Sequence, residues 1–121
     1  MKTAMKSAVP ILRIFDEKKA REFYLDFLAF TCDWEHRYEP DMPLYMQISN
    51  GECIIHLSEH YGDATPGSAI RIEVEDAEAL QKHLLSKSYT YARPGFDKEW
   101  HAVKLTDPFG NRLHFYSSKE A

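Results

Sequence analysis

Histidine, cysteine and carboxylate side chains of this sequence could bind a metal ion, and cysteine and serine could act as nucleophiles. The two cysteines, Cys32 and Cys53, are widely spaced and form no Cys-x-x-Cys pair. We therefore expect both to be reduced and partly buried, rather than to bind a metal or act as a catalytic thiol. The sequence has no Gly-x-Ser-x-Gly turn around a serine nucleophile, no glycine-rich phosphate loop and no dinucleotide fingerprint. No catalytic residue is accordingly assigned from the sequence.

The aromatic residues offer a different chemistry, which is the binding of a flat ligand. Trp34 and Trp100 each lie in a stretch that is otherwise polar. A tryptophan in this setting either packs over the rim of a fold with its indole nitrogen in water, or presents a ring on which a planar ligand stacks. Tyr45 and Tyr116, on predicted strands, would add surface that is both apolar and hydrogen-bonding. The acidic residues near the tryptophans either attract a cationic ligand or are simply solvated; these are Asp33, Glu35, Glu39, Asp41, Asp97 and Glu99.

Sequence patterns predict the elements that must position these residues. A strand over residues 9–15 starts near Pro10, which lacks a backbone donor, so this strand should lie at a sheet edge. A helix follows over residues 18–30, because apolar residues recur there at helical spacing and Asp16 is placed to cap it. Three strands are then predicted over residues 31–35, 44–49 and 52–58, with a loop over 36–43 and a hairpin turn at Asn50-Gly51.

The same order of elements starts again after a turn-rich linker over residues 59–67. It comprises a strand over 68–74, a helix from Asp76 to about Ser88, an extended stretch over 89–93, and strands over 100–106 and 111–117 around Asp107-Pro-Phe-Gly110. The halves correspond with a shift of about 60 residues, which is the mark of an internal repeat. The predicted fold is α+β, with two β-α-β-β-β modules, at about residues 8–60 and 68–118, in a single domain over residues 1–121.

Length and composition are those of an ordinary globular domain. The 121 residues are 44% hydrophobic and carry a net charge of −4. This charge argues against a nucleic-acid-binding protein, which needs a basic face. The N-terminal apolar run is too short to cross a bilayer, and it lacks the small-residue cleavage pattern of a secretory signal. These features predict a cytoplasmic protein with neither a nucleic acid nor a membrane as partner.

Several segments resemble the vicinal oxygen chelate superfamily, also called the glyoxalase/bleomycin-resistance superfamily, and in particular its bleomycin-binding resistance proteins. The resemblance spans nearly the whole chain. It rests on residues 7–12 (Ser-Ala-Val-Pro-Ile-Leu), the aromatic pattern of residues 23–30, Trp100, and the Asp-Pro-x-Gly-Asn-x-x-His-Phe run of residues 107–115. It implies that the strands curl into a half-open mixed sheet around a ligand cavity, which a second subunit completes. Pro10 would then stiffen an N-terminal arm that reaches this neighbour.

Enzymes of this superfamily bind a divalent metal at four strand positions, which the resemblance maps to Val9, His56, Ala69 and His114. Val9 and Ala69 have no donor atoms, whereas a catalytic metal needs about three protein ligands and an open position. The resemblance therefore implies neither a metal nor another cofactor, and it makes His56 and His114 cavity residues that would face each other. A two-histidine metal site completed by Glu73 or by another chain stays open as an alternative.

The resemblance implies a role in antibiotic resistance, in which the protein sequesters a bleomycin-like glycopeptide or another planar cationic compound without changing it. Trp34 and Trp100 match the aromatic walls that hold the drug's planar bithiazole group. The ligand would lie in a cleft at the interface of a homodimer. Two alternatives stay open. The first is an enzyme of the same superfamily, a lyase, isomerase or thiol transferase, with a relocated metal site. The second is a small-metabolite sensor. The expected ligand-binding residues are Trp34, Trp100, Phe30, Tyr45, His56, His101, His114 and Tyr116.

Overall fold

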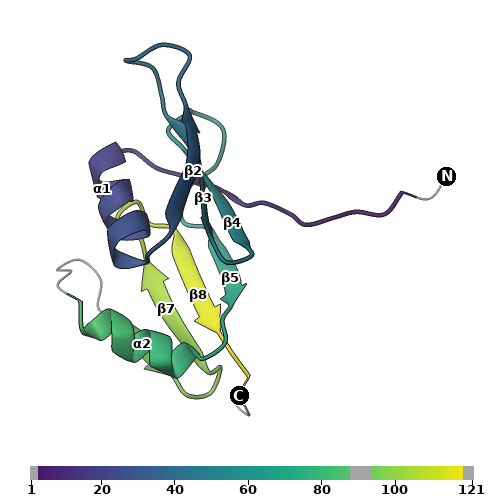
Figure 1. Ribbon diagram of the computed structural model, residues 1–121, viewed down its shortest axis with the longest axis vertical. Helices are drawn as coiled ribbons and strands as arrows, with labels where there is room; N and C mark the ends of the chain where they lie inside the picture. The colour runs from purple at the N-terminus through teal and green to yellow at the C-terminus, as the bar shows by residue number, and fades with distance from the viewer. Residues whose placement is uncertain (1–2, 88–93, 119–121) are drawn as a thin grey trace.

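The computed structural model describes residues 3–87 and 94–118, whose strands form two four-stranded sheets (Figure 1). The strand orders are β1-β4-β3-β2 and β5-β8-β7-β6. Each half of the chain contributes one sheet in the order strand, helix, three strands, which confirms the predicted repeat and the α+β class. The elements are β1 (Ile11–Arg13), α1 (Glu17–Arg21), the π-helix η1 (Glu22–Phe27), β2 (Thr31–His36), β3 (Tyr45–Asn50), β4 (Cys53–Ser58), β5 (Ala69–Glu73), α2 (Ala77–Leu85), β6 (Gly95–Asp97), β7 (Ala102–Thr106) and β8 (Arg112–Tyr116).

Both sheets are mixed, because the first strand of each module pairs in parallel with the last. β1 pairs with β4 and β5 with β8, while the other neighbours are antiparallel. β1 lies at a sheet edge, as Pro10 predicts, and the carbonyl of Pro10 accepts a hydrogen bond from the amide of His56 at 3.0 Å. The hairpin between β3 and β4 turns at Asn50-Gly51, where Gly51 has the positive φ of 59° that favours glycine.

The first helix is shorter than predicted and changes character along its length. Asp16 caps it as expected, since its carboxylate accepts from the amide of Lys19 at 3.0 Å. From Glu22 the helix widens into a π-helix, in which the amide of Leu28 donates to the carbonyl of Phe23 at 3.0 Å. The helix stops before Phe30 because Ala29 adopts a φ of 60°.

The second module departs from the prediction at the end of α2, at the unpredicted strand β6 and at Trp100. Helix α2 is capped by Asp76, as predicted, and ends at Leu85, with Ser86 as its C-cap. The extended stretch predicted over residues 89–93 lies outside the described residues. Trp100 was predicted on a strand, but it lies in the turn between β6 and β7. The turn is closed by Asp97, whose carboxylate accepts from the amides of Glu99 and Trp100 at 2.9 and 3.1 Å.

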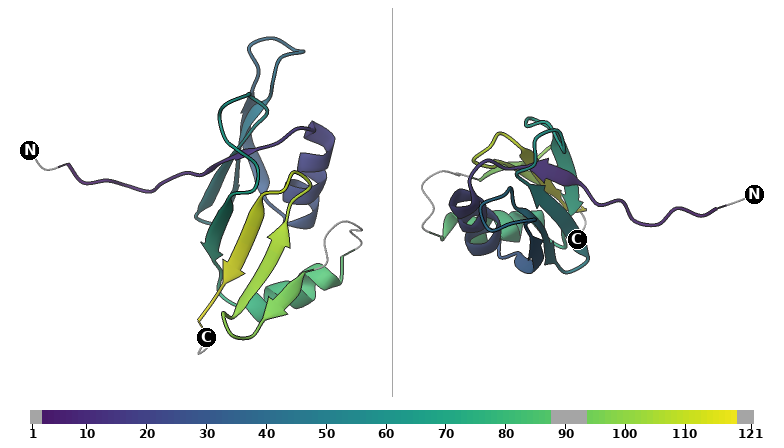
Figure 2. Two further views of the ribbon diagram at one scale, coloured as in Figure 1. Left: turned by 180° about the vertical axis from the view of Figure 1, so that it is seen from behind. Right: turned by 90° about the horizontal axis from the view of Figure 1, so that it is seen from above.

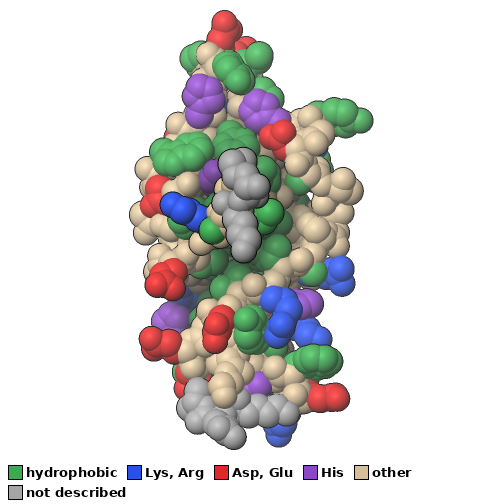
Figure 3. Space-filling model, turned by 90° about the vertical axis from the view of Figure 1, so that its right-hand side faces the viewer, with side chains coloured by type: hydrophobic (Ala, Val, Ile, Leu, Met, Phe, Trp, Pro, Cys, Tyr) green, Lys and Arg blue, Asp and Glu red, His purple; other side chains and the backbone are tan. Residues whose placement is uncertain are grey.

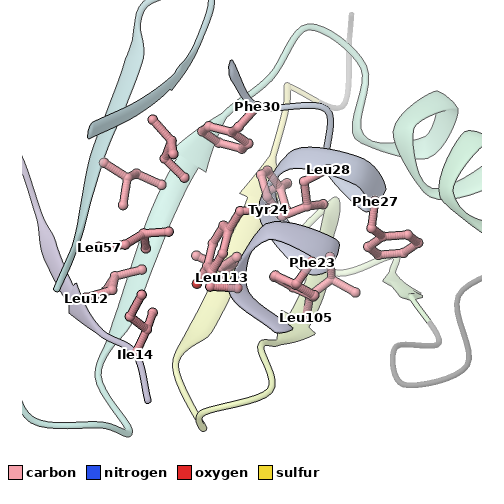
Figure 4. Close-up of a cluster of buried hydrophobic side chains, with 14 of the residues drawn as sticks. Leu12, Ile14, Phe23, Tyr24, Phe27, Leu28, Phe30, Leu57, Leu105 and Leu113 are labelled. Atoms are coloured by element: carbon pink, nitrogen blue, oxygen red, sulfur yellow. The ribbon is translucent and has the colours of Figure 1, made fainter. Parts of the chain in front are cut away.

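The helices α1 and α2 cover the same side of the two sheets, and the N-terminal arm leaves from the other side (Figures 1 and 2). The core lies between helices and sheets and joins the two modules. In Figure 4, Leu12 and Leu57 of the first sheet and Leu105 and Leu113 of the second belong to one cluster with Tyr24. Among the described residues, no helix has the length and apolar character needed to cross a membrane.

The Asp107-Pro-Phe-Gly110 turn ties the modules together through one buried carboxylate. One oxygen of Asp107 accepts from the amides of Phe109 and Asn111, at 2.9 and 2.8 Å. The other accepts from the hydroxyl of Tyr24 at 2.5 Å and from the side-chain amide of Asn111 at 2.9 Å. That amide also donates to the carbonyl of Arg13 at 2.8 Å. The motif therefore joins the second module to the first helix and the first strand.

Candidate ligand-binding face

The face of the two sheets away from the helices, which we call the open face, carries the polar and half-exposed side chains of the strands. Side chains alternate between the faces, so in β3 Met46 and Ile48 are buried while Tyr45 and Gln47 are partly exposed. Figure 3 shows the molecule from the side on which the N-terminal arm projects. Histidine and hydrophobic side chains gather in the upper part of this view, and several lysine and arginine side chains in the lower part.

A bulge in β2 turns Trp34 onto the open face. Cys32 pairs with the buried Ile48, but the register then shifts and Trp34 pairs with Gln47. The extra residue, Asp33, interrupts the alternation that would otherwise place Trp34 on the side of Cys32. The indole consequently keeps 44% of its surface exposed.

Trp34, Tyr45 and His56 form one cluster, the aromatic platform. The rings of Trp34 and Tyr45 are stacked, with centroids 6.0 Å apart and an angle of 12° between their planes. The imidazole of His56 stands edge-on to both, at 5.3 Å from Trp34 and 5.2 Å from Tyr45. The structure thus brings together three of the residues predicted to bind a ligand, in an arrangement typical of aromatic packing.

A chain of hydrogen bonds fixes this platform. The carboxylate of Asp33 accepts from the side chains of Gln47 and Ser49, at 3.0 and 2.9 Å. The amide nitrogen of Gln47 is therefore directed at Asp33, and its carbonyl oxygen faces Nε2 of His56 at 2.9 Å. Because that oxygen only accepts, Nε2 carries the hydrogen and Nδ1 accepts from the hydroxyl of Tyr45 at 2.7 Å. Burial lowers the pKa of His56, which favours the same neutral form.

A second cluster lies on the open face of the second sheet. Arg71, Trp100, Ala102, Lys104 and His114 line a pocket of about 300 Å³, which we call the basic pocket. Arg71 and Lys104 lie on the two strands beside His114 and pair with it in register. The pKa of His114 is lowered, first by burial and then by the positive charges of Lys104, Arg112 and Arg71.

Two further contacts order the basic pocket. The guanidinium carbon of Arg71 lies 4.0 Å from the centre of the Tyr116 ring, a cation–π contact. Nζ of Lys104 lies 3.5 Å from the carboxylate of Asp97. Tyr116 thus lies beside the pocket as a support for Arg71, and Trp100 forms an exposed aromatic wall with 64% of its surface accessible.

The donor set does not fit the metal site that the resemblance associates with this fold. Val9 lies outside β1, and the residue opposite His56 is Ile11. Ala69 pairs with Arg112, while the residue opposite His114 is Arg71, a permanent cation. Both ring nitrogens of His56 are already hydrogen-bonded. No group of three His, Cys, Asp or Glu side chains suited to a metal ion occurs within residues 3–87 and 94–118.

Phe30 is predicted to bind the ligand, but it does not lie on the open face. Phe30 is only 6% exposed and belongs to the core, where its ring stands edge-on to that of Tyr24 at 6.4 Å. The reason is the turn at Ala29, after which the amide of Phe30 donates back to the carbonyl of Tyr24 at 2.9 Å.

His101, also predicted at the cavity, lies on the helix side of the second sheet. Its Nδ1 is 3.0 Å from the hydroxyl oxygen of Ser117, which also accepts from the amide of Ala77 at the start of α2. Its ring packs edge-on against Phe96 at 5.0 Å. A φ of 51° at His101 directs it away from the neighbouring Trp100.

Three of the six acidic residues expected near the tryptophans, Asp33, Glu35 and Asp97, are engaged by partners within the chain. Glu35 pairs with Arg21 at 2.6 Å, and Asp33 accepts from two side chains of β3. Asp97 closes the turn before Trp100 and pairs with Lys104. These carboxylates therefore hold the protein's own groups in place, and less of their charge is available to a cationic ligand than the sequence predicts.

Three residues of this face were not predicted from the sequence, namely Gln47, Arg71 and Lys104. All three pair in register with one of the two repeat-related histidines, Gln47 with His56 and the other two with His114. Alternation along each strand is a signal that could have placed them on the histidine face. The pairing of β5 with β8, which brings Arg71 beside His114, joins strands far apart in sequence and could not be read from the chain.

Comparisons with known proteins agree with this architecture. A family model described as Glyoxalase superfamily protein matches residues 2–121. No functionally curated protein sequence matches the chain. Among solved structures, the bleomycin-binding protein of Streptomyces verticillus, in complex with copper(II)-bleomycin, is 27% identical with a TM-score of 0.69, over 98% of this chain and 100% of that protein.

Two more distant structures share the fold. The antibiotic-binding protein TnmS3 of a Streptomyces species is 17% identical with a TM-score of 0.70, over 97% of this chain and 100% of its own. The trypanothione-dependent glyoxalase I of Leishmania major is also 17% identical with a TM-score of 0.70, over 96% of this chain and 89% of its own. The repeat of two mixed sheets and the full-length family match lead to one conclusion. The chain belongs to the glyoxalase superfamily, also known as the vicinal oxygen chelate superfamily, and is close to its bleomycin resistance proteins.

Proposed function

We propose that this protein binds a planar aromatic small molecule without changing it, as an antibiotic-sequestering protein of the bleomycin-binding type. The observation that carries the proposal is the aromatic platform on the open face. Trp34 stacks on Tyr45, and its indole stays partly exposed. A flat ring can therefore add to the stack from outside. Each such aromatic contact contributes on the order of 1 kcal/mol beyond the burial of surface.

The rigidity of the platform supports a binding role. His56 is held by both of its ring nitrogens, and Gln47 is held by Asp33. Because these side chains are already ordered before the ligand binds, less side-chain entropy is lost on binding. The 27% identity to a protein that was solved with copper(II)-bleomycin supports a small-molecule ligand.

We further propose that the binding cleft is completed by a second copy of the chain. Residues 3–9 of the N-terminal arm are all exposed and project away from the sheets (Figure 2). Val9, Ile11 and Ile54, at and near the edge strand β1, are each about 40% exposed, which leaves apolar surface in water. A two-fold partner would cover this edge. It would also bring a Trp100 from one chain toward the Trp34 of the other. Within one chain these residues belong to different modules, Trp34 to β2 and Trp100 to the turn between β6 and β7.

A titration with bleomycin tests the proposal. We expect saturable quenching of tryptophan fluorescence, and recovery of the drug unchanged by mass spectrometry. Trp34→Ala should weaken binding by roughly 1–3 kcal/mol, the effect of removing an aromatic anchor. Tyr61→Ala is the matched control, because Tyr61 is 95% exposed and lies in the loop between β4 and β5.

The results separate this proposal from the other functions of the superfamily. Equal affinity of the parent and Trp34→Ala would place the ligand elsewhere than the platform. Recovery of a modified drug would replace sequestration by an enzymatic reaction. The donor set described above favours no metal-dependent reaction, since Ile11 and Arg71 occupy the positions opposite the two histidines.

A further inference from the structure

The open face of the second sheet is basic, in contrast to the acidic charge of the whole chain. We propose that the basic pocket binds an anionic group, and that the ligand of this protein is a planar aromatic compound that carries a carboxylate. The proposal rests on the binding function above and specifies the chemistry of the ligand. It differs from the sequence-based expectation of a cationic compound.

Arg71 is the central residue of this pocket. The cation–π contact at 4.0 Å sets the guanidinium over the Tyr116 ring and limits its freedom. This contact is with the ring and uses no hydrogen-bond acceptor, so the N–H groups of the guanidinium remain for an anionic group. A planar fork of N–H donors matches the two oxygens of a carboxylate, and less entropy is lost on binding when the fork is already oriented.

Lys104 adds a second cation on the neighbouring strand. It pairs in register with His114, as Arg71 does on the other side, so the two cations flank the histidine. Its partner Asp97 also accepts from two backbone amides of the turn, so that carboxylate holds the turn as well as the ammonium group. A ligand carboxylate would therefore meet two positive groups and one histidine at the same place.

The surrounding charges leave the face with an excess of cations. Arg112 lies on β8, two residues from His114, and donates to the carbonyl of Gly67 at 3.1 Å. Glu73 lies at the far end of β5, where it pairs with Tyr116. The open face of the second sheet thus has three basic side chains, Arg71, Lys104 and Arg112, against the carboxylates of Glu73 and Asp97. Glu52 of the first module lines a separate neighbouring pocket with Arg71 and Glu73.

The state of His114 agrees with this assignment. Burial and the three nearby cations lower its pKa, so it is neutral at pH 7 and has a ring N–H to donate. A bound anion would offset part of the positive field and raise the pKa of His114. Trp100, at the edge of the same pocket, offers a ring next to the group that would hold the carboxylate.

The probes that test this inference are 2-naphthoate and its neutral counterpart 2-naphthamide, which share one ring system and differ in charge. We expect naphthoate to bind about tenfold more tightly than naphthamide, the scale of one charge-assisted contact. Arg71→Gln and Lys104→Gln should each lower the affinity for naphthoate by about fivefold to tenfold and leave the affinity for naphthamide unchanged. Lys82→Gln is the matched control, since Lys82 lies on α2 and pairs with Glu78, away from the pocket.

The readouts are fluorescence titration and the ring titration of His114 by NMR, whose midpoint should rise when naphthoate is bound. Equal affinity of the two probes, or an unchanged preference in Arg71→Gln, would overturn the inference. In that case saturable naphthamide binding that depends on Trp34 would leave the proposed function intact. Failure of both probes and of bleomycin to bind would overturn the two proposals together.

Discussion

Removal of a single hydroxyl group, in Tyr24→Phe, should destabilise the fold because that hydroxyl joins the two modules. Tyr24 is fully buried, and its hydroxyl donates to the carboxylate of Asp107 at 2.5 Å across 83 positions of sequence. Phenylalanine keeps the ring and its packing against Phe23 and Phe30. The variant therefore removes the hydrogen bond with little change in volume.

The magnitude follows from what remains around the carboxylate. A hydrogen bond to a charged group contributes about 1.5–3 kcal/mol, and a buried acceptor left without its donor loses more than that bond alone. Asp107 keeps three other donors, the amides of Phe109 and Asn111 and the side chain of Asn111. We therefore expect a loss of about 2 kcal/mol in the free energy of unfolding, near the middle of that range.

Urea unfolding at one fixed protein concentration measures this loss. The midpoint should fall by about 1 M, with an unchanged dependence of the free energy on urea, because the surface exposed on unfolding is the same. Tyr61→Phe is the control, since it removes a hydroxyl from a side chain that is 95% exposed. It should leave the midpoint unchanged.

The pH dependence gives an independent check. Burial, followed by the charge of Asp107 and the hydrogen bond to it, raises the pKa of Tyr24 well above the ordinary value of 10.0. Above that pH the unfolded chain loses this proton while the folded chain keeps it, so stability falls as pH rises. The fall should be shallower in Tyr24→Phe. A loss below about 0.5 kcal/mol together with an unchanged alkaline slope would refute the role given to this hydrogen bond.

Three further predictions concern protonation, assembly and a turn. The pKa values of His56 and His114 are lowered, so both rings should titrate below 6.5 by NMR. The free energy of unfolding should decrease as pH falls below that value, because the unfolded chain binds these protons more readily than the folded chain. Midpoints at or above 6.5 would contradict the desolvation of these rings. Sedimentation at micromolar concentration should give a dimer. Ile54→Lys should shift this dimer toward monomer, because it places a charge on the exposed apolar edge. A monomeric parent protein would exclude the shared cleft. Gly110→Ala should lower the free energy of unfolding by roughly 1–2 kcal/mol, because φ is 94° at this position. Gly95→Ala is the control and should cause no such loss, because Gly95 has equally open space and no positive φ. Equal stabilities of the two variants would show that the turn relaxes.

Much of the fold could be predicted from local signals in the sequence. Asp16 and Asp76 cap their helices, Asn50-Gly51 turns the hairpin, and Pro10 marks the edge strand. Each of these effects acts within a few residues, so the residue type alone carries the information. The repeat of the whole pattern then predicts two similar modules, and the structure has them.

The orientation of individual side chains depended on departures from regularity that the sequence does not mark. The bulge at Asp33 turns Trp34 to the open face, and a left-handed Ala29 turns Phe30 into the core. The carboxylate of Asp97 places Trp100 in a turn rather than on a strand. A shift of one residue reverses the face of every later side chain in a strand, so patterns of alternation fail at such places.

The sequence by itself determined that the chain has paired modules, two widely spaced cysteines without a Cys-x-x-Cys motif, and two histidines at equivalent positions. Only the tertiary structure decided what surrounds those histidines. His56 lies among Tyr45, Gln47 and Trp34, whereas His114 lies between Arg71 and Lys104. Tyr45, Gln47 and Lys104 come from the neighbouring strand of a hairpin, whereas Trp34 and Arg71 come from strands farther away in the chain. The field at each ring is the sum over all of these neighbours. Two residues that are alike in sequence therefore face different chemistry, because sheet register rather than residue type chooses their neighbours.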